Sequence, residues 1–348
     1  MTRVVGIDAG TMSLDVCGIV DGRIYLDRSW PTPEALAQPE PFIELLTASG
    51  SPDLIAGPSG YGLPLIRAAQ ATDADLRLAF LAAPDEPGGI GGLRGLVRRL
   101  GAAGLPVIYT PGVIHLGTVP AHRKVNRVDL GTADKLCAAV LAVREHCERR
   151  SRSPHEASFI LVELGGAFTA AIAVERGEVV DGVGGTSGPI GWRAAGALDG
   201  EVAFLAGSIS KAALFQGGVD ALMARGEREL ALRAYLEGVE KTVRQLHCSA
   251  PSADEIVLSG RHASDAILRE SLATRLHDIG LVRLLTGRAV VAKQGAEGAA
   301  LLAEGLAGGT SQAIVDQLKI RESSGSVLDH LVFISPAAAR KRLGMPHD

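Results

Sequence analysis

The stretch VVGIDAGTMSLDVCGI, residues Val4–Ile19, decides the fold class of this chain. Its first half is an apolar strand that ends in Asp8, a turn of small residues follows, and a second apolar strand is expected over 14–20. The next two residues, Asp21-Gly22, are a tight hairpin signal, and a third strand is expected over 23–27. The chain therefore opens with a β-meander and not with a strand–helix–strand unit.

The same pattern returns in the second half of the chain, in ILVELGGAFTAAIAV (Ile160–Val174). An apolar strand that carries Glu163 leads into the turn Gly165-Gly166-Ala167, a second strand follows, and a third is expected over 178–183. Glu163 stands 155 residues after Asp8. Repetition at this distance predicts two copies of one supersecondary unit that face each other.

The remaining segments alternate between helix and strand, which is typical of an α/β protein. Helices are expected at 34–48, 93–100, 132–149, 227–247, 264–277 and 296–306, and further strands at 54–57, 107–109 and 255–258. Two short strands are also expected, one that ends at 290–291 and one over 331–334. The polar, Pro-interrupted stretch ERRSRSPHE at 148–156 is the expected domain boundary. We predict two domains, residues 1–150 and 151–348.

Composition excludes several classes of function. The 348 residues carry a net charge of −4 and only 4% aromatic side chains, which gives no basis for a nucleic-acid or anionic-membrane partner. The four cysteines form no CxxC pair, so neither a zinc site nor a disulfide framework is expected. No apolar run reaches the roughly 18 residues of a membrane helix, and no signal-peptide pattern is present. We therefore expect a cytoplasmic protein.

The two repeated turns are candidates for phosphate binding. Gly10 and Thr11 follow Asp8, and glycine lets the backbone approach an anion closely, while consecutive N–H groups in such a turn form an anion-binding concavity. Asp8 and Glu163 are candidate Mg²⁺ ligands, because Mg²⁺ takes few carboxylates and keeps several waters. Each turn alone also fits an ordinary hairpin with a solvated acid. Their recurrence favours two turns that clamp a polyphosphate.

Small residues elsewhere suggest further contacts with a nucleotide or an acceptor. Ser259-Gly260 ends a strand, where small residues would let an adenosine lie against the backbone. Gly295 stands at the start of a helix of small residues, which close helix crossing requires. Ser59-Gly60 follows a strand end where an acceptor could bind. The alternative for Ser259-Gly260 is a generic buried strand with its turn, and the alternative for Gly295 is a tightly packed core helix.

The densest basic group near these motifs contains Arg123, Lys124 and Arg127. Cations should meet a transferring phosphoryl group, so Arg123 and Arg127 are candidate catalytic residues. The alternative is a solvated basic loop. Asp134, in the first turn of the helix expected at 132–149, is a candidate to orient Mg²⁺ or the acceptor, or else an acid that the helix dipole stabilises. Lys135 is interpreted as a solvated helix residue.

Taken in order, five segments resemble the signature segments of the acetate kinase/sugar kinase/Hsp70/actin superfamily. The two repeated stretches resemble its phosphate-1 and phosphate-2 motifs, and IVLSGRHA (256–263) resembles its adenosine motif. LGTADKLCAAVLAV (130–143) and AKQGAEGAALLAEGL (292–306) resemble its two connect motifs. The resemblance implies two ribonuclease H-like (actin-like ATPase) domains that flank a nucleotide cleft, with ATP and Mg²⁺ as ligands.

Within that superfamily the chain resembles a DUF1464-type group of predicted butyrate kinases. GALDGEVAFLAGSIS (Gly196–Ser210) is similar to a segment of butyrate kinases, which makes Asp199 and Glu201 candidate substrate residues. A helix N-terminal acid is the alternative for Glu201. The sequence departs from the usual pattern at Asp15, where butyrate and acetate kinases carry Lys. It also departs at Asp8, where they carry Asn, and at Glu163, where the superfamily normally carries Asp.

The resemblance implies an ATP-dependent phosphotransferase that forms or consumes an acyl phosphate on a short-chain carboxylate. A carboxylate is already ionised at neutral pH, so the acceptor needs no activating base. Two alternatives stay open. One is a kinase for a hydroxyl substrate such as a sugar, with Asp134 as candidate base; the other is a non-catalytic, ATP-switched regulator. Acetate-kinase-like enzymes are often dimers, which implies a homodimer by analogy.

Overall fold

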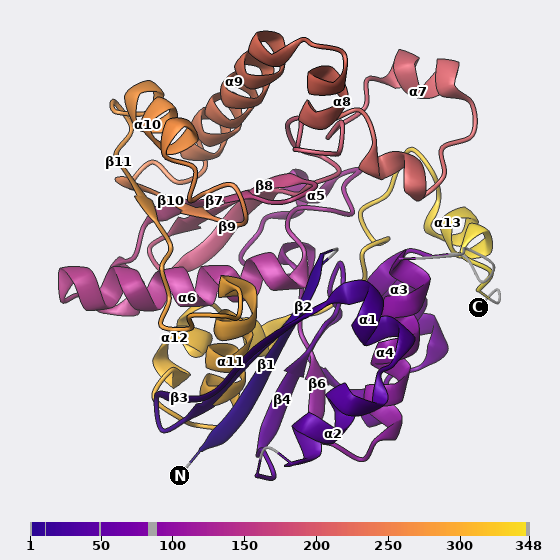
Figure 1. Cartoon of the computed structure of the whole chain (residues 1–348), viewed down its shortest axis with the longest axis vertical. Coiled ribbons are helices and arrows are strands. Elements are labelled where there is room, and N and C mark those ends of the chain that lie inside the picture. Colours follow the sequence, from indigo (N-terminus) through magenta and orange to yellow (C-terminus); the bar gives the residue numbers. More distant parts are fainter. Residues whose placement is uncertain (1, 11, 49, 83–88, 346–348) are drawn as a thin grey trace.

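Figure 1 shows the computed structural model of the chain, which describes residues 2–10, 12–48, 50–82 and 89–345. The strands are β1 (Arg3–Ala9), β2 (Ser13–Val20), β3 (Arg23–Pro31), β4 (Leu54–Gly57), β5 (Ile66–Arg67), β6 (Val107–Tyr109), β7 (Phe159–Leu164), β8 (Thr169–Glu175), β9 (Glu178–Val183), β10 (Glu255–Ser259) and β11 (Leu281–Leu284). The α-helices are α1 (Thr32–Ala37), α2 (Glu40–Ala48), α3 (Asp73–Phe80), α4 (Gly89–Ala102), α5 (Ala121–Lys124), α6 (Ala133–Arg150), α7 (Gly200–Ala206), α8 (Val219–Ala224), α9 (Arg228–His247), α10 (Ala266–Arg275), α11 (Gln294–Leu306), α12 (Gln312–Gln317) and α13 (Pro336–Arg342). Short 3-10 turns are η1 (Ala68–Gln70), η2 (Val113–His115), η3 (Pro154–Glu156), η4 (Ala212–Phe215) and η5 (Ile320–Glu322).

Two sheets repeat one topology, as the recurring sequence pattern predicts. The strand order is β3-β2-β1-β4-β6-β5 in the first sheet and β9-β8-β7-β10-β11 in the second. In both, the first three strands are an antiparallel meander and the fourth pairs in parallel with the first. Each middle strand has a register shift, after Gly18 in β2 and after Ala173 in β8, again 155 residues apart. The two halves are therefore structural repeats.

The molecule is built in layers around these sheets (Figure 1). One hydrophobic core lies between the sheets and contains most of α6 and α11, together with one face of each sheet. A second core packs α9 and α10 onto the outer face of the second sheet. A third packs α2, α3 and α4 onto the outer face of the first sheet. The central layer brings the N-terminal ends of α6 and α11 close to the two repeated turns.

Small side chains let α11 lie in this central layer. A Cβ at Gly6 of β1 would stand 2.1 Å from the backbone N of Ala300, and one at Gly298 of α11 would stand 1.9 Å from the carbonyl oxygen of Cys137 in α6. Both neighbours therefore touch α11 backbone to backbone, where any larger residue would clash. This close packing is the reason for the small-residue pattern of the 292–306 segment.

Three sequence expectations about elements were wrong. The helix expected at 34–48 is two helices, α1 and α2, because Pro39 interrupts it. Neither 290–291 nor 331–334 forms a strand; the edge strand of the second sheet is β11, and the segment before α13 is irregular.

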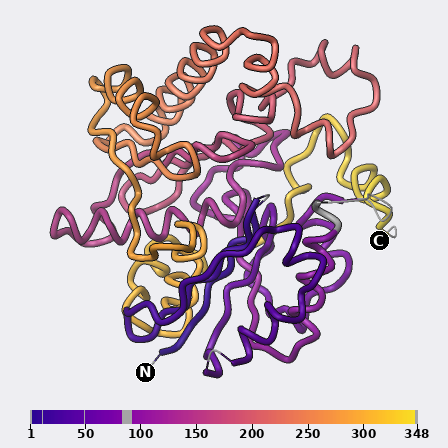
Figure 2. Tube along the Cα trace, viewed as in Figure 1, coloured from indigo at the N-terminus to yellow at the C-terminus, as the bar shows by residue number. Residues whose placement is uncertain are grey.

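The C-terminal part of the chain packs against the first sheet and its helices. Helix α11 packs on β1, and Arg77 of α3 donates to the carbonyl oxygen of Leu343, after α13. Figure 2 shows the corresponding yellow segments beside the indigo N-terminal half. The boundary near residue 150 stays a prediction.

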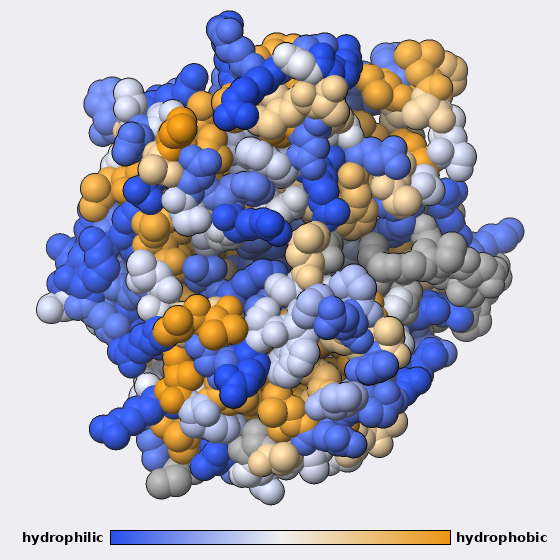
Figure 3. Space-filling view, in the orientation of Figure 1, coloured by the Kyte–Doolittle hydropathy of each residue, from blue (hydrophilic) through white to orange (hydrophobic). Residues whose placement is uncertain are grey.

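The surface is mixed, with hydrophobic side chains gathered in places. Figure 3 shows such side chains at the upper right, where Figure 1 places α7, and Phe204 and Leu205 of this helix are exposed. In the described part of the chain, no helix combines the length and the hydrophobicity that a bilayer crossing requires.

Candidate functional site

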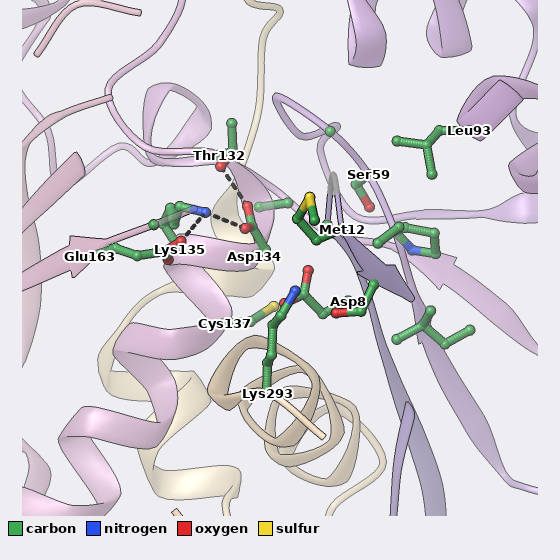
Figure 4. Close-up of a pocket in the computed structure, with 18 of the residues that line it drawn as sticks. Asp8, Met12, Ser59, Leu93, Thr132, Asp134, Lys135, Cys137, Glu163 and Lys293 are labelled. Atoms are coloured by element: carbon green, nitrogen blue, oxygen red, sulfur yellow. Dashed lines mark hydrogen bonds and ion pairs between the residues drawn. The ribbon is translucent and has the colours of Figure 1, made fainter. Parts of the chain in front are cut away.

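A cavity of about 700 Å³ lies where the repeated turns of the two sheets approach each other. Figure 4 shows it between the end of β1, the start of α6, the end of β7 and the start of α11. Its lining includes Asp8, Gly10, Met12, Trp30, Pro58, Ser59, Gly60, Phe80, Leu93, Asp134, Lys135, Glu163, Gly165, Gly166, Ala167, Gly260, Arg261 and Lys293. The structure thus brings together most of the residues that the sequence singled out.

Carboxylates gather on the floor of the cavity. Asp8 at the end of β1 pairs in register with Asp15 of β2, so both side chains lie on the same face of the sheet. Glu163 occupies the equivalent place in β7, and Asp134 comes from the first turn of α6. Carboxylates that share one site repel each other and are stabilised in their ionised form by cations placed between them.

Lys135 supplies one of these cations. Its Nζ lies 2.5 Å from Asp134 Oδ2 and 2.8 Å from Glu163 Oε1, so one ammonium group bridges α6 and β7 (Figure 4). Burial opposes the charged form, but these two carboxylates hold the pKa of Lys135 well above its usual range. The interpretation of Lys135 as a solvated helix residue was wrong, because the N-terminus of α6 lies in the cavity wall.

The carboxylates of the cluster titrate differently. Burial raises the pKa of Asp8, the nearby Asp134 adds to this increase, and the pKa reaches about 7. Lys293 and Lys135 lower this pKa and only partly offset the two effects. Burial also acts on Asp134, but the Lys135 ammonium and the Thr132 hydroxyl lower its pKa. The pKa of Glu163 is raised by burial despite Lys135. Asp8 is therefore the carboxylate that most lacks a cation.

The two turns are closed in the same way. Gly10 N donates to Ser13 O at 2.9 Å, and Gly165 N donates to Phe168 O at 3.0 Å. These two N–H groups are used within the turns, so they do not contribute to the anion-binding concavity that the sequence suggested. Thr11, the other expected contact in the first turn, lies outside the described residues.

One arm of the cavity extends into the first half of the molecule and is mostly apolar. Trp30, Pro58, Phe80 and Leu93 line it, and Ser29, Tyr61 and Thr110 add polar groups to the lining from the same half. The hydroxyl of Ser59 is already engaged there, because it donates to Gly57 O and accepts from Thr110 N. This arm offers an apolar wall with few free polar groups.

The other expected nucleotide contacts lie at or next to the cavity. Gly260 lines it with a φ of +88°, and a Cβ there would meet the side chain of Glu163 at 2.8 Å. Ser259 is buried in β10. Gly295 packs against Asp8, since a Cβ would stand 2.6 Å from Asp8 Oδ2.

Four candidate residues lie away from this cavity. Arg123 donates to Val180 O and, with Arg127, lines a separate small pocket of about 180 Å³. The structure does not bring either arginine to the phosphate turns, because α5 lies beside β9. Asp199 caps α7 by accepting from Glu201 N and Val202 N. Glu201 lies in the first turn of α7, as the helix-terminus alternative for this residue predicts, and neither residue lines the cavity.

Sequence reasoning missed two lysines that line the cavity, Lys135 and Lys293. Lys293 lies 3.3 Å from Asp15 and points into the cavity (Figure 4). The available signal was Asp15, which stands on the same face of the meander as Asp8: two neighbouring acids on one buried face require a cation from another element.

Comparison with known proteins places the chain in a family. The family model described as "Protein of unknown function (DUF1464)" matches residues 6–333. The chain belongs to the DUF1464 family. Comparison of this DUF1464 protein with curated protein sequences gave no significant match.

Solved structures similar to the DUF1464 protein include two kinases of short-chain acids. A propionate kinase from Francisella tularensis subsp. tularensis SCHU S4 is 13% identical, with a TM-score of 0.59 over 86% of this chain and 99% of that one. Acetate kinase from Entamoeba histolytica is 12% identical, with a TM-score of 0.58 over 80% and 87%. These similarities show that the chain shares the α/β fold of these two kinases, which confirms the predicted fold class.

Proposed function

We propose that this DUF1464 protein is an ATP-dependent phosphotransferase whose acceptor is a small carboxylate with an apolar tail. The observation that carries the proposal is a single cavity that joins the acid-bearing turns of both halves to an apolar arm. A polyphosphate with a divalent cation suits the carboxylates beside the turns, while the arm suits an alkyl chain. The fold shared with acetate and propionate kinases supports the same class of reaction.

The residues present fit a nucleotide with a divalent cation. Burial raises the pKa of Asp8 to about 7, which marks a carboxylate in need of a positive partner. Asp8 would hold Mg²⁺, with Asp134 and Glu163 nearby, and Mg²⁺ would neutralise charge on the phosphoryl oxygens. In the part of the chain that the structure describes, no group of three or more His, Cys, Asp or Glu side chains is placed to hold a metal ion. Mg²⁺ here would therefore have to take phosphate oxygens and water as its other ligands.

The chain's own groups position the reactants. A carboxylate oxygen of the acceptor attacks the γ-phosphorus of ATP, the bond to the β,γ-bridging oxygen breaks, and ADP leaves with its electron pair. No base is needed, because the acceptor is already ionised. Lys135 keeps Asp134 and Glu163 paired, and the apolar arm excludes water from the acyl chain.

The apolar arm favours a carboxylate over a sugar. Sites that recognise hydroxyl groups use polar partners for each of them. Here the arm is walled by Trp30, Pro58, Phe80 and Leu93, and the Ser59 hydroxyl is satisfied by the backbone. A sugar bound there would leave hydroxyl groups without partners. The homodimer and the cytoplasmic location stay predictions.

The test is a hydroxamate assay with ATP, Mg²⁺ and acids from acetate to valerate. A parallel assay offers glucose as the acceptor and measures ADP release. We expect acyl hydroxamate with the four- and five-carbon acids and a loss of about 100-fold or more in Asp8→Ala, which removes both oxygens of the side chain. Asp220→Asn, at an exposed carboxylate outside the cavity, is the matched control. Two results would overturn the proposal: ADP release that requires glucose, or no acyl hydroxamate with any of the acids.

A further inference from the structure

Lys293 stands over the first repeated turn. Its Nζ lies 3.3 Å from Asp15 Oδ2, and a Cβ at Gly10 would stand 2.8 Å from this Nζ. Asp15 itself is 1% exposed and also accepts from the Ser13 hydroxyl at 2.6 Å. The Lys293 side chain is 40% exposed, so the ammonium group is anchored on one side and open to the cavity on the other.

The backbone before Lys293 is held by an array of carboxylates. The segment 286–292, here called the strap, links β11 of the second sheet to α11. Its seven consecutive N–H groups donate at 2.6–3.0 Å, the first two to Glu145, the next two to Glu297 and the last three to Asp27. Burial opposes ionisation of Asp27, but these three bonds lower its pKa. The position of the residue that follows the strap is thus fixed from three elements.

We propose that Lys293 binds the terminal phosphoryl group of a polyphosphate in this cavity, with Asp15 and the strap as its positioning groups. The ammonium group is a compact charge with three N–H donors. Among the described residues, Asp15 is its one carboxylate partner within ion-pair distance, which leaves donors for a ligand. Because the cation is already held in position, little free energy is spent on reorganisation when negative charge develops on the phosphoryl group. The inference rests on the proposed function for the nature of the ligand and not for the acceptor.

The experiment measures binding by calorimetry for ATP, inorganic tripolyphosphate and AMP, each with Mg²⁺. The variants are Lys293→Gln and, as the matched control, Lys241→Gln at an exposed lysine of α9. We expect Lys293→Gln to weaken ATP and tripolyphosphate binding by about 10-fold to 100-fold, as for loss of a charged hydrogen bond, and to leave AMP binding within about 2-fold. Unchanged ATP binding, or an equal loss for AMP, would overturn the inference.

A double-mutant cycle tests the strap. Asp27→Asn should weaken ATP binding in the wild-type background and have no effect on it in Lys293→Gln, because Asp27 acts through Lys293. Equal losses in both backgrounds would show that the strap does not position the lysine.

The outcomes also separate this inference from the proposed function. Lys293-dependent ATP binding without transfer to any acid would support the inference and overturn the proposed acceptor. A wild-type protein that binds neither ATP nor tripolyphosphate would overturn both.

Discussion

Replacing Asp8 by Asn should make the ligand-free protein more stable. Burial and the nearby Asp134 raise the pKa of Asp8 to about 7 from a usual value of 3.8. An acid whose folded pKa is raised costs stability as pH rises from its unfolded pKa to its folded pKa, because the unfolded chain releases the proton first. Above pH 7 the full cost of about three pKa units is about 4 kcal/mol. Asparagine removes this cost.

The assay is thermal unfolding in EDTA at pH 8 and pH 5. For a chain of 348 residues, about 4 kcal/mol corresponds to a midpoint increase of roughly 5 °C at pH 8, and the smaller cost at pH 5 to roughly 2 °C. Asp220→Asn should show neither increase. Saturating Mg²⁺–ATP should reverse the order, because the ionised Asp8 then gains a cation. A midpoint increase that is the same at both pH values, or a decrease at pH 8, would refute the reasoning.

Three further outcomes are expected. Lys135→Gln leaves two half-buried carboxylates without their shared cation and should lower the free energy of unfolding by about 2 kcal/mol in urea titrations; a loss under about 0.5 kcal/mol, as for an exposed ion pair, would contradict the bridge. Arg123→Gln with Arg127→Gln should change kcat/KM by less than about 3-fold, since both lie outside the cavity, and a loss like that of the Asp8 variant would return them to the site. Gly298→Ala should cost about 3 kcal/mol or more, because its Cβ would stand 1.9 Å from the backbone of α6. Gly95→Ala, with nothing within 4 Å in α4, should gain about 0.5–1 kcal/mol in the same assay, and similar effects of the two alanines would argue against the close packing of α11.

Local sequence predicted the repeat and the residues that its geometry dictates. A strand that ends in an acid, a small turn and a returning strand are read from a few neighbouring residues, so Asp8, Glu163 and both turns could be placed in advance. Gly295 could be placed for the same reason, because small residues at a helix start indicate close backbone contact. The structure puts Asp8, Glu163 and the two turns on one cavity, with Gly295 packed against Asp8.

The basic residues were harder to assign from sequence. Arg123 and Arg127 are close to the 130–143 motif along the chain, yet α5 and the residues that follow it place them beside β9, at a separate pocket. The sequence does not assign Lys135 to the site, because helix periodicity does not reveal that the first turn of α6 lies between two sheets. Nearness in sequence is a poor guide for long, flexible cations, whose partners depend on how elements pack.

The sequence by itself determined the two β-meanders, the acids at their strand ends and the small-residue helix between them, because these follow from local periodicity and steric size. Only the tertiary structure decided which cations serve those acids. Lys293 stands 278 residues after Asp15, and the strap that delivers it is held by Asp27 and by carboxylates from α6 and α11. Such contacts arise from the packing of distant elements, and no local pattern specifies them.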